Sequence, residues 1–458
     1  MVAHPYIPNS DTETKKEMLA CIGIRDPEQL FANIPDTLRV KTPLNLPNSL
    51  SESELKSYVE ETLSRNLSCK DLLNFRGGGC WQHYVPAVCD EINSRSEFLT
   101  AYTGEAYSDL GRYQALFEFQ SMIGELVALD AVIFPLYDWA TAVGDAVLMA
   151  TIATNRNEIL VPKTIGPERL AVMKNYCGNT VKIVYVDYAA NGQLDLQDLE
   201  RKTSTNTAAV YIENPSYLGH IETNCKEIAR IAHTHGGLLI VGVEPLSLGV
   251  LASPGEYGAD IVCGECQPLG LHMGFGGVSL GFLACHDQEK FLSATGHRLI
   301  TIATTERVGE WGFTYVLPER SMFAAREKAA SITGTTTAIW AITTAVYLAL
   351  LGPTGLTELA KSIMQRTQYA MKRISEIRRL TVPVFDSPHF EEFTVNFDGT
   401  GKTVAQVNRI LLENGILGGN DISHDFPQLG QTALFCINEL HRQQDIDKLA
   451  IALEEAVK

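Results

Sequence analysis

The stretch CGECQPLGLHMGFGG contains the residue types best suited to chemistry, because it pairs two thiols at the spacing Cys263-x-x-Cys266. Such a pair is half of a zinc site or a thiol–disulfide redox motif. A zinc site needs a second pair at a suitable spacing, but Cys285 and His286 are adjacent and His272 stands alone. A redox pair lies at a helix N-terminus, whereas Cys263 ends an apolar strand pattern. We therefore expect two small buried thiols and no metal site.

The glycine-rich end of this stretch, Gly274 to Gly277, does not match a nucleotide-binding motif. It lacks the G-x-G-x-x-G spacing and the lysine and serine of a phosphate-binding loop. A tight turn is sufficient to explain these glycines. No serine has the nucleophile-elbow context of a hydrolase. The sequence thus argues against both nucleotide-binding and hydrolytic sites.

Glu244 is a carboxylate at the end of a continuously apolar run, LLIVGVEP. A carboxylate in that place can pair with a cation, such as a protonated pyridine nitrogen. It can equally be a solvated or helix-capping carboxylate, and the sequence leaves both interpretations open. The elements around Glu244 must decide between them.

Short apolar runs alternate with helical patterns between about residues 75 and 290. The runs are EILVP, VKIVYVD, AAVYIENP, LLIVGVEP, GADIVCGE and VSLGFLACH. Continuously apolar strands are typical of a mostly parallel sheet buried on both faces, and amphipathic stretches such as ETNCKEIARIAHTH supply the crossover helices. Ligands bind at the carboxyl ends of such strands. This places residues 213–217, 244–247 and 264–277 around one crevice.

The pattern divides the chain into three parts. Residues 1–70 are predicted to form a helical N-terminal extension, in which Ser51 begins a capping box. Residues 71–325 contain the large α/β domain. Residues 326–458 contain a connecting helix and a small C-terminal α+β domain.

The composition indicates a cytoplasmic protein that does not bind nucleic acid. Its 54 acidic residues against 37 basic ones give a net charge of −17, which opposes binding to a phosphate backbone. The ten cysteines are spread along the chain, as reduced thiols are, and the N-terminus shows no secretory pattern. The uncharged segment 329–357 has a short apolar run followed by Pro353, so we expect a buried helix and no membrane span.

The sequence resembles, over nearly its whole length, the subunit 1 (α chain) family of the two-chain glycine dehydrogenase (decarboxylating), the P-protein of the glycine cleavage system. The segments that carry the resemblance are KKEMLACIGIRDPEQLFANIP, LSESEL, GGGCWQHYVPAV, SRSEFLTAYT, QALFEFQSMIGEL, EPLSLGVLASPGEYGADIVCGECQPLG and FGGVSLGF. The block from Glu244 to Gly281 is the most specific of them.

The resemblance implies the fold of pyridoxal-phosphate-dependent transferases, fold type I, with the aspartate aminotransferase architecture. It also implies an oxidoreductase of glycine catabolism, in which this chain supports the decarboxylation of glycine and the transfer of its aminomethyl group to the lipoyl H-protein. Gln267 stands where a β chain would have its Schiff-base lysine, and an amide cannot form an imine. We therefore expect no catalytic residue in this chain, and pyridoxal phosphate held covalently by a lysine-bearing β subunit within a heterotetramer.

Several segments depart from the α-chain pattern, and they keep two alternatives open. YDGATA becomes Tyr137-Asp138-Trp139-Ala-Thr-Ala, and the usual Asp-Pro becomes Glu244-Pro245. A large Trp139 should change the volume of the pocket. One alternative is a paralogous subunit that acts with a β-like partner on a different amino acid or acceptor. The other is a non-catalytic structural or regulatory homologue that self-associates as a homodimer.

The candidates for lining the pocket come from the segments that the resemblance and the predicted sheet edge share. They are His83, Tyr84, Tyr102, Asp138, Thr141, Glu213, Glu244 and Gln267. Each has a simpler interpretation. His83 suits a satisfied core histidine, the two tyrosines suit core aromatics, and Thr141 suits a helix cap.

Overall fold

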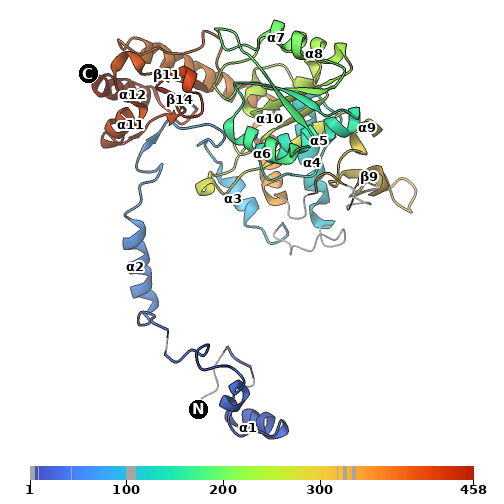
Figure 1. Ribbon diagram of the computed structural model, residues 1–458, viewed down its shortest axis with the longest axis vertical. Coiled ribbons are helices and arrows are strands. Elements are labelled where there is room, and N and C mark those ends of the chain that lie inside the picture. The colour runs from blue at the N-terminus through green and yellow to red at the C-terminus, as the bar shows by residue number, and fades with distance from the viewer. Residues whose placement is uncertain are drawn as a thin grey trace. The chain divides into compact units, whose positions relative to one another are not determined.

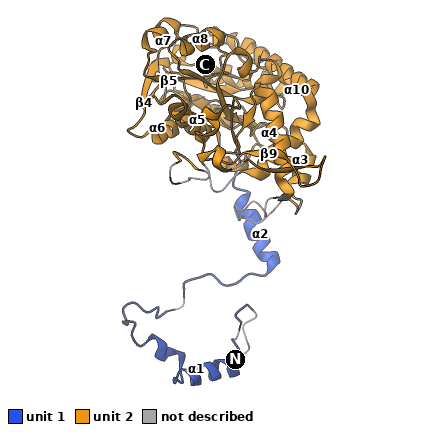
Figure 2. Ribbon diagram, turned by 90° about the vertical axis from the view of Figure 1, so that its right-hand side faces the viewer, with its two compact units in different colours: residues 1–67 blue, residues 68–458 orange. Residues whose placement is uncertain are grey.

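The computed structural model describes residues 6–8, 10–42, 44–98, 110–316, 318–322, 327, 329–332 and 337–458. The chain forms two compact units, residues 1–67 and residues 68–458 (Figure 2). The division of the second unit near residue 325 stays a prediction. Tyr102, one of the expected pocket residues, lies outside the described residues.

Unit 1 consists of helices whose starts follow from capping residues in the sequence. They are α1 (Thr12–Cys21), the 3-10 helix η1 (Pro27–Phe31) and α2 (Glu52–Leu63). At α2 the Ser51 side chain accepts the Glu54 backbone N–H, and the Glu54 carboxylate accepts the Ser51 backbone N–H, which completes the capping box. These three helices contain no buried residue.

Unit 2 is built on a seven-stranded sheet of order β2-β8-β7-β6-β5-β3-β4 (Figure 1). Its strands are β2 (Ala131–Val132), β3 (Glu158–Pro162), β4 (Lys182–Val186), β5 (Thr207–Glu213), β6 (Leu238–Val243), β7 (Ile261–Glu265) and β8 (Gly281–Cys285). Neighbours from β4 to β7 pair in parallel, and β8 is antiparallel to both β7 and β2. The predicted runs therefore form the sheet, and all residues of β5, β6 and β7 are buried.

Helices cover both faces of this sheet. The helices of unit 2 are α3 (Ala87–Asn93), α4 (Tyr113–Val127), α5 (Trp139–Thr154), α6 (Pro167–Cys177), α7 (Leu196–Lys202), α8 (Cys225–Thr234), α9 (Glu289–Leu292), α10 (Ala338–Ser375), α11 (Val404–Glu413) and α12 (Gln443–Ala456). One apolar core joins strand residues to α4, α7, α8 and α10. A second core joins the alternate strand residues to α5, α6 and α9. Cores on both sides explain why the strands are apolar without alternation.

The C-terminal part adds a small three-stranded antiparallel sheet of order β11-β14-β13. Its strands are β11 (Glu392–Asn396), β13 (Asn420–Asp421) and β14 (Thr432–Cys436), and the remaining strands of unit 2 are β1 (Leu73–Asn74), β9 (Ile300–Thr304), β10 (Trp311–Tyr315) and β12 (Ile416–Leu417). A separate core packs this sheet against α11, α12 and the end of α10. Strand β1 pairs in parallel with β12, so the segment that follows unit 1 is tied to the C-terminal part.

Helix α10 is long and apolar enough to cross a membrane by length and composition. It is interrupted at Gly352, whose φ of 59° is left-handed, and Pro353 follows at once. Ile342, Leu348 and Leu356 of this helix are buried in the core beside the large sheet. Packing within unit 2 therefore buries part of the apolar surface of this helix.

Candidate functional site

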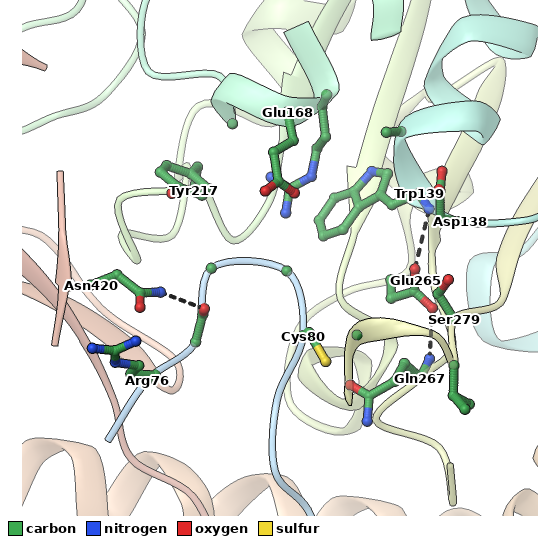
Figure 3. Close-up of a pocket in the computed structure, with 18 of the residues that line it drawn as sticks. Arg76, Cys80, Asp138, Trp139, Glu168, Tyr217, Glu265, Gln267, Ser279 and Asn420 are labelled. Atoms are coloured by element: carbon green, nitrogen blue, oxygen red, sulfur yellow. Dashed lines mark hydrogen bonds between the residues drawn. The ribbon is translucent and has the colours of Figure 1, made fainter. Parts of the chain in front are cut away.

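A cleft of about 860 Å³ opens at the carboxyl ends of the parallel strands (Figure 3). Its walls come from the starts of α5 and α6, the segments after β5 and β7, a glycine-rich loop at 77–79, and the C-terminal part near α11 and β13. Asp138 and Trp139 face this space from the start of α5, Tyr217 faces it from the segment after β5, and Asn420 faces it from β13. The cleft therefore lies at the sheet edge where ligands bind in this kind of fold.

Asp138 lines the cleft and caps helix α5. Its extended backbone precedes the helix, and its carboxylate accepts the backbone N–H of Thr141 at 2.6 Å. Thr141 is buried within α5 and is not among the residues that line the cleft. Trp139, the first residue of α5, is also buried, and its backbone N–H donates to the Glu265 carboxylate at 3.2 Å. Capping thus fixes the direction in which α5 begins.

Gln267 lies at the cleft wall with its amide group fully committed. Its Oε1 accepts the backbone N–H of Trp81 at 2.9 Å, and its Nε2 donates to the carbonyls of Trp81 and Leu271 at 3.0 and 2.9 Å. Only 1% of the residue is exposed. The side chain of Gln267 therefore bridges two backbone segments, those of Trp81 and Leu271.

Glu265 is a functional-site residue that the sequence pattern did not single out. It ends β7, lines the cleft, and accepts backbone N–H groups from Leu280, Gln267 and Trp139. Burial raises the pKa of Glu265 to about 7, although these hydrogen bonds oppose the shift. The sequence did offer one signal for Glu265, because this carboxylate ends an apolar run, as Glu244 does.

Glu244 is buried at the end of β6 and takes the capping role that the sequence left open. Its two carboxylate oxygens accept the backbone N–H groups of Leu246 and Ser247, at 2.8 and 2.9 Å, and so begin the 3-10 helix η4 (Pro245–Gly249). Burial raises the pKa of Glu244 well above its ordinary value. It does not line the large cleft; it lines a small cavity of about 10 Å³ behind it.

Glu213 ends β5 and is buried in an ion pair with Arg169 of α6. The Arg169 Nη1 atom lies 3.0 Å from the Glu213 carboxylate, which also accepts the Tyr211 hydroxyl at 3.1 Å. The Arg169 guanidinium lies over the Trp139 ring, 3.7 Å from its centroid. Arg169 lines the cleft but Glu213 does not. The sequence offered no signal for Arg169 beyond its position in the first turn of a helix begun by Pro167.

His83 and Tyr84 lie on the segment that follows the glycine-rich loop, and neither is among the residues that line the cleft. His83 is buried between Glu439, 2.9 Å from Nδ1, and Glu391, 3.5 Å from Nε2. Burial alone lowers the pKa of His83, but hydrogen bonds to these two carboxylates outweigh it and raise the pKa to about 10. Tyr84 is 62% exposed, and its backbone N–H donates to Glu439 at 2.7 Å.

Of the pair Cys263-x-x-Cys266, Cys263 lies in β7 and Cys266 directly follows this strand. Cys263 and Cys266 are both free and fully buried, and burial raises the pKa of both thiols. Within the part of the chain that the structure describes, no group of three or more histidine, cysteine or acidic side chains could hold a metal ion. Thiol or metal chemistry therefore has no geometric support among these residues.

A large, mostly parallel sheet with a cleft at its carboxyl edge and a small C-terminal sheet defines the fold of the pyridoxal-phosphate-dependent enzymes of fold type I. Two solved structures show this fold at low identity. A NifS-like protein is 12% identical with a TM-score of 0.63, and a sphingosine-1-phosphate lyase of Burkholderia pseudomallei is 14% identical with a TM-score of 0.61. They cover 84% and 91% of this chain, and 98% and 93% of their own chains.

The chain belongs to the glycine cleavage system P-protein family, whose model matches residues 4–453. It is 40% identical to a probable glycine dehydrogenase (decarboxylating) subunit 1 of Staphylothermus marinus, over 100% of this chain and 99% of the relative. The corresponding protein of Thermococcus onnurineus is 39% identical over 98% of this chain and 99% of its own. A crystal structure of a glycine decarboxylase (P-protein) of the glycine cleavage system, in inhibitor-bound form, matches with a TM-score of 0.85, 34% identity and full coverage of both chains.

Proposed function

We propose that this chain is the lysine-free α subunit of a glycine decarboxylase of the P-protein type. It acts with a lysine-bearing β subunit that holds pyridoxal phosphate covalently, and the pair decarboxylates glycine and passes the aminomethyl group to the lipoyl H-protein. The observation that carries the proposal is the full-length similarity to proteins named glycine dehydrogenase (decarboxylating) subunit 1. Pyridoxal phosphate supplies the electron sink for decarboxylation when bound.

The residues present do not suit covalent attachment of this cofactor to the chain itself. Position 267 offers no amine, and the amide of Gln267 is held by the backbone of Trp81 and Leu271. Glu244, at the end of β6, is used by the backbone of η4. We therefore assign no step of the reaction to a cofactor on this chain. Its own residues shape the walls of the cleft, from the carboxyl ends of the large sheet to α11 and β13 of the C-terminal part.

The test is reconstitution of the pair. Purified alone, the chain should show no Schiff-base absorbance and no glycine decarboxylation. Combined with a lysine-bearing β chain and with H-protein, it should exchange label between bicarbonate and the carboxyl carbon of glycine. Full exchange by the lysine-bearing chain alone, or by this chain alone, would contradict the subunit assignment.

A second candidate, a paralogous subunit for another amino acid, is favoured by one observation. Trp139 is a large aromatic side chain at the cleft wall, and a change of volume there alters which substrates a pocket accepts. In the same reconstituted pair, activity toward a larger or smaller amino acid without glycine exchange would favour this candidate. Failure of every amino acid, with a stable homodimer of this chain in solution, would favour a structural role.

A further inference from the structure

The place where an aromatic, phosphate-bearing cofactor would lie in this fold can be located from its elements. Ligands lie outside the carboxyl ends of parallel strands, and phosphate groups lie at helix N-termini. In this chain the ends of β5, β6 and β7 face the N-terminus of α5, whose first residue is Trp139. The surroundings of the Trp139 side chain therefore show whether this region has space for a cofactor.

The Trp139 indole lies directly against the sheet. It is 5% exposed, and a Cβ added to Gly242 of β6 would come within 2.9 Å of two of its ring atoms. A side chain at position 242 would thus collide with the indole, and glycine leaves the room that the ring takes. The indole occupies the space above β6, two residues before Glu244.

Arg169, which lies in α6, contacts the Trp139 indole, and its charge is neutralised by Glu213. Its guanidinium lies over the indole, 3.7 Å from the centroid, in a cation–π contact. The same group pairs with Glu213 at 3.0 Å, and both side chains are almost fully buried. The cationic group of Arg169 therefore already has an aromatic ring and a carboxylate as its partners.

The space left behind the indole is too small for a cofactor ring. Trp139, Arg169 and Tyr217 line both the cleft of about 860 Å³ and the cavity of about 10 Å³, so they form the partition between the two. Glu244 lies on the small side of this partition. A cavity of that size holds roughly one water molecule, whereas a pyridine ring with its substituents needs far more.

We propose that Trp139 is an internal occupant of the cofactor cavity: it closes the cavity of this chain to pyridoxal phosphate, and its removal reopens a binding site for that cofactor beside Glu244. The proposal goes beyond the subunit assignment, because it concerns binding to this chain alone and holds whichever amino acid the pair acts on. It separates two obstacles to cofactor binding. One is the missing amine at position 267, and the other is the space that the Trp139 indole fills.

The test is binding of pyridoxal phosphate to the full-length chain, measured by equilibrium dialysis and calorimetry. The wild-type chain and Gln267→Lys should show no saturable binding. Trp139→Gly should bind pyridoxal phosphate saturably, at concentrations at least about tenfold below the highest one at which the wild type shows no binding, because removing the indole leaves a cavity lined by aromatic and polar groups. Trp311→Gly is the matched control, since Trp311 is 67% exposed on β10 and its removal should leave binding unchanged.

A double variant that has both an amine at position 267 and free space at position 139 should bind pyridoxal phosphate covalently. In Trp139→Gly with Gln267→Lys, the introduced amine should condense with the aldehyde of pyridoxal phosphate to an imine, with loss of water. Borohydride should then reduce this imine to a stable secondary amine on the peptide containing position 267. Mass spectrometry would locate it, and inorganic phosphate in excess would show whether the phosphate group alone drives binding. Trp139→Ala, which keeps a better helix former at the start of α5, replaces Trp139→Gly if circular dichroism shows that the glycine variant is unfolded.

Three outcomes would overturn the proposal. One is saturable binding of pyridoxal phosphate to the wild-type chain, which needs no variant to observe. Another is a trapped adduct on Gln267→Lys with Trp139 intact. The third is a folded Trp139→Gly or Trp139→Ala chain that binds no better than the wild type. None of them bears on glycine exchange by the reconstituted pair, so failure here is distinguishable from failure of the proposed function.

Discussion

Two buried polar clusters fix the same segment, residues 77–84, to the rest of unit 2, and they are built in opposite ways. The amide cluster consists of Gln267, Trp81 and Leu271, which exchange neutral hydrogen bonds. The charged cluster consists of His83, Glu391 and Glu439, in which one histidine lies between two carboxylates. The first is held by uncharged contacts alone, while the second depends on a proton.

This difference teaches how buried polar groups can be satisfied with and without a charge. A neutral amide satisfies backbone groups without needing a counter-charge. A buried carboxylate pair tolerates burial only with a cation between its members. The stability of unit 2 should therefore respond strongly to loss of the histidine, less to loss of the amide, and in a pH-dependent way only through the charged cluster.

The largest effect is expected from His83→Ala. It leaves Glu391 and Glu439 buried without their cation, and removal of one partner from a buried ion pair costs about 3–5 kcal/mol. Chemical denaturation would measure this loss in the free energy of unfolding. His233→Ala is the control, because His233 pairs with Asp260 at a partly exposed site. Partial recovery in His83→Ala with Glu391→Gln would support the electrostatic cause, and equal losses for both histidine variants would contradict it.

The next effect is expected from Gln267→Ala. It removes three hydrogen bonds and leaves the Trp81 N–H and two carbonyls without these partners, which should lower the free energy of unfolding by about 2–4 kcal/mol. Gln114→Ala, at an exposed glutamine that donates to Glu118, should change it by less than about 0.5 kcal/mol. If Gln267→Ala and Gln114→Ala change the free energy of unfolding by similar amounts, the hydrogen bonds of the Gln267 amide do not stabilise unit 2 as proposed.

The pH dependence should distinguish the clusters. The pKa of His83 is raised from 6.5 to about 10 in the folded chain. Its contribution is therefore fully present below about pH 6.5 and is lost as the pH rises toward 10, by at most about 1.4 kcal/mol per pH unit. Denaturation from pH 6 to 10 should give a flatter profile for His83→Gln than for the wild type. Gln267→Ala should keep the wild-type slope, and an unchanged slope in His83→Gln would refute the assignment.

The smallest effect is expected from Tyr84→Ala, beside the charged cluster. Its side chain is 62% exposed and its link to Glu439 is through the backbone N–H, which alanine retains. The free energy of unfolding should change by less than about 0.5 kcal/mol. A loss comparable to that of His83→Ala would mean that the tyrosine ring, and not the histidine, holds the cluster together.

Sequence reasoning predicted the elements well and the roles of the site residues less well. The continuously apolar runs gave the strands of the large sheet, since local composition reflects burial on both faces. The capping box at Ser51 is present. Among the expected pocket residues, Asp138 and Gln267 line the cleft, Glu244 lines the small cavity behind it, and Glu213 reaches the cleft only through Arg169.

What the sequence by itself determined is the fold class, the family and the absence of an amine at position 267, because these depend on composition along the chain and on the identity of single residues. Only the tertiary structure decided what those residues do. Gln267 meets Trp81 across 186 positions of sequence, and Trp139 meets Arg169 only because α5 and α6 pack side by side. Such contacts are set by the packing of elements that are distant in the sequence. A local pattern therefore could not show which side chains surround the Trp139 indole or which space it fills.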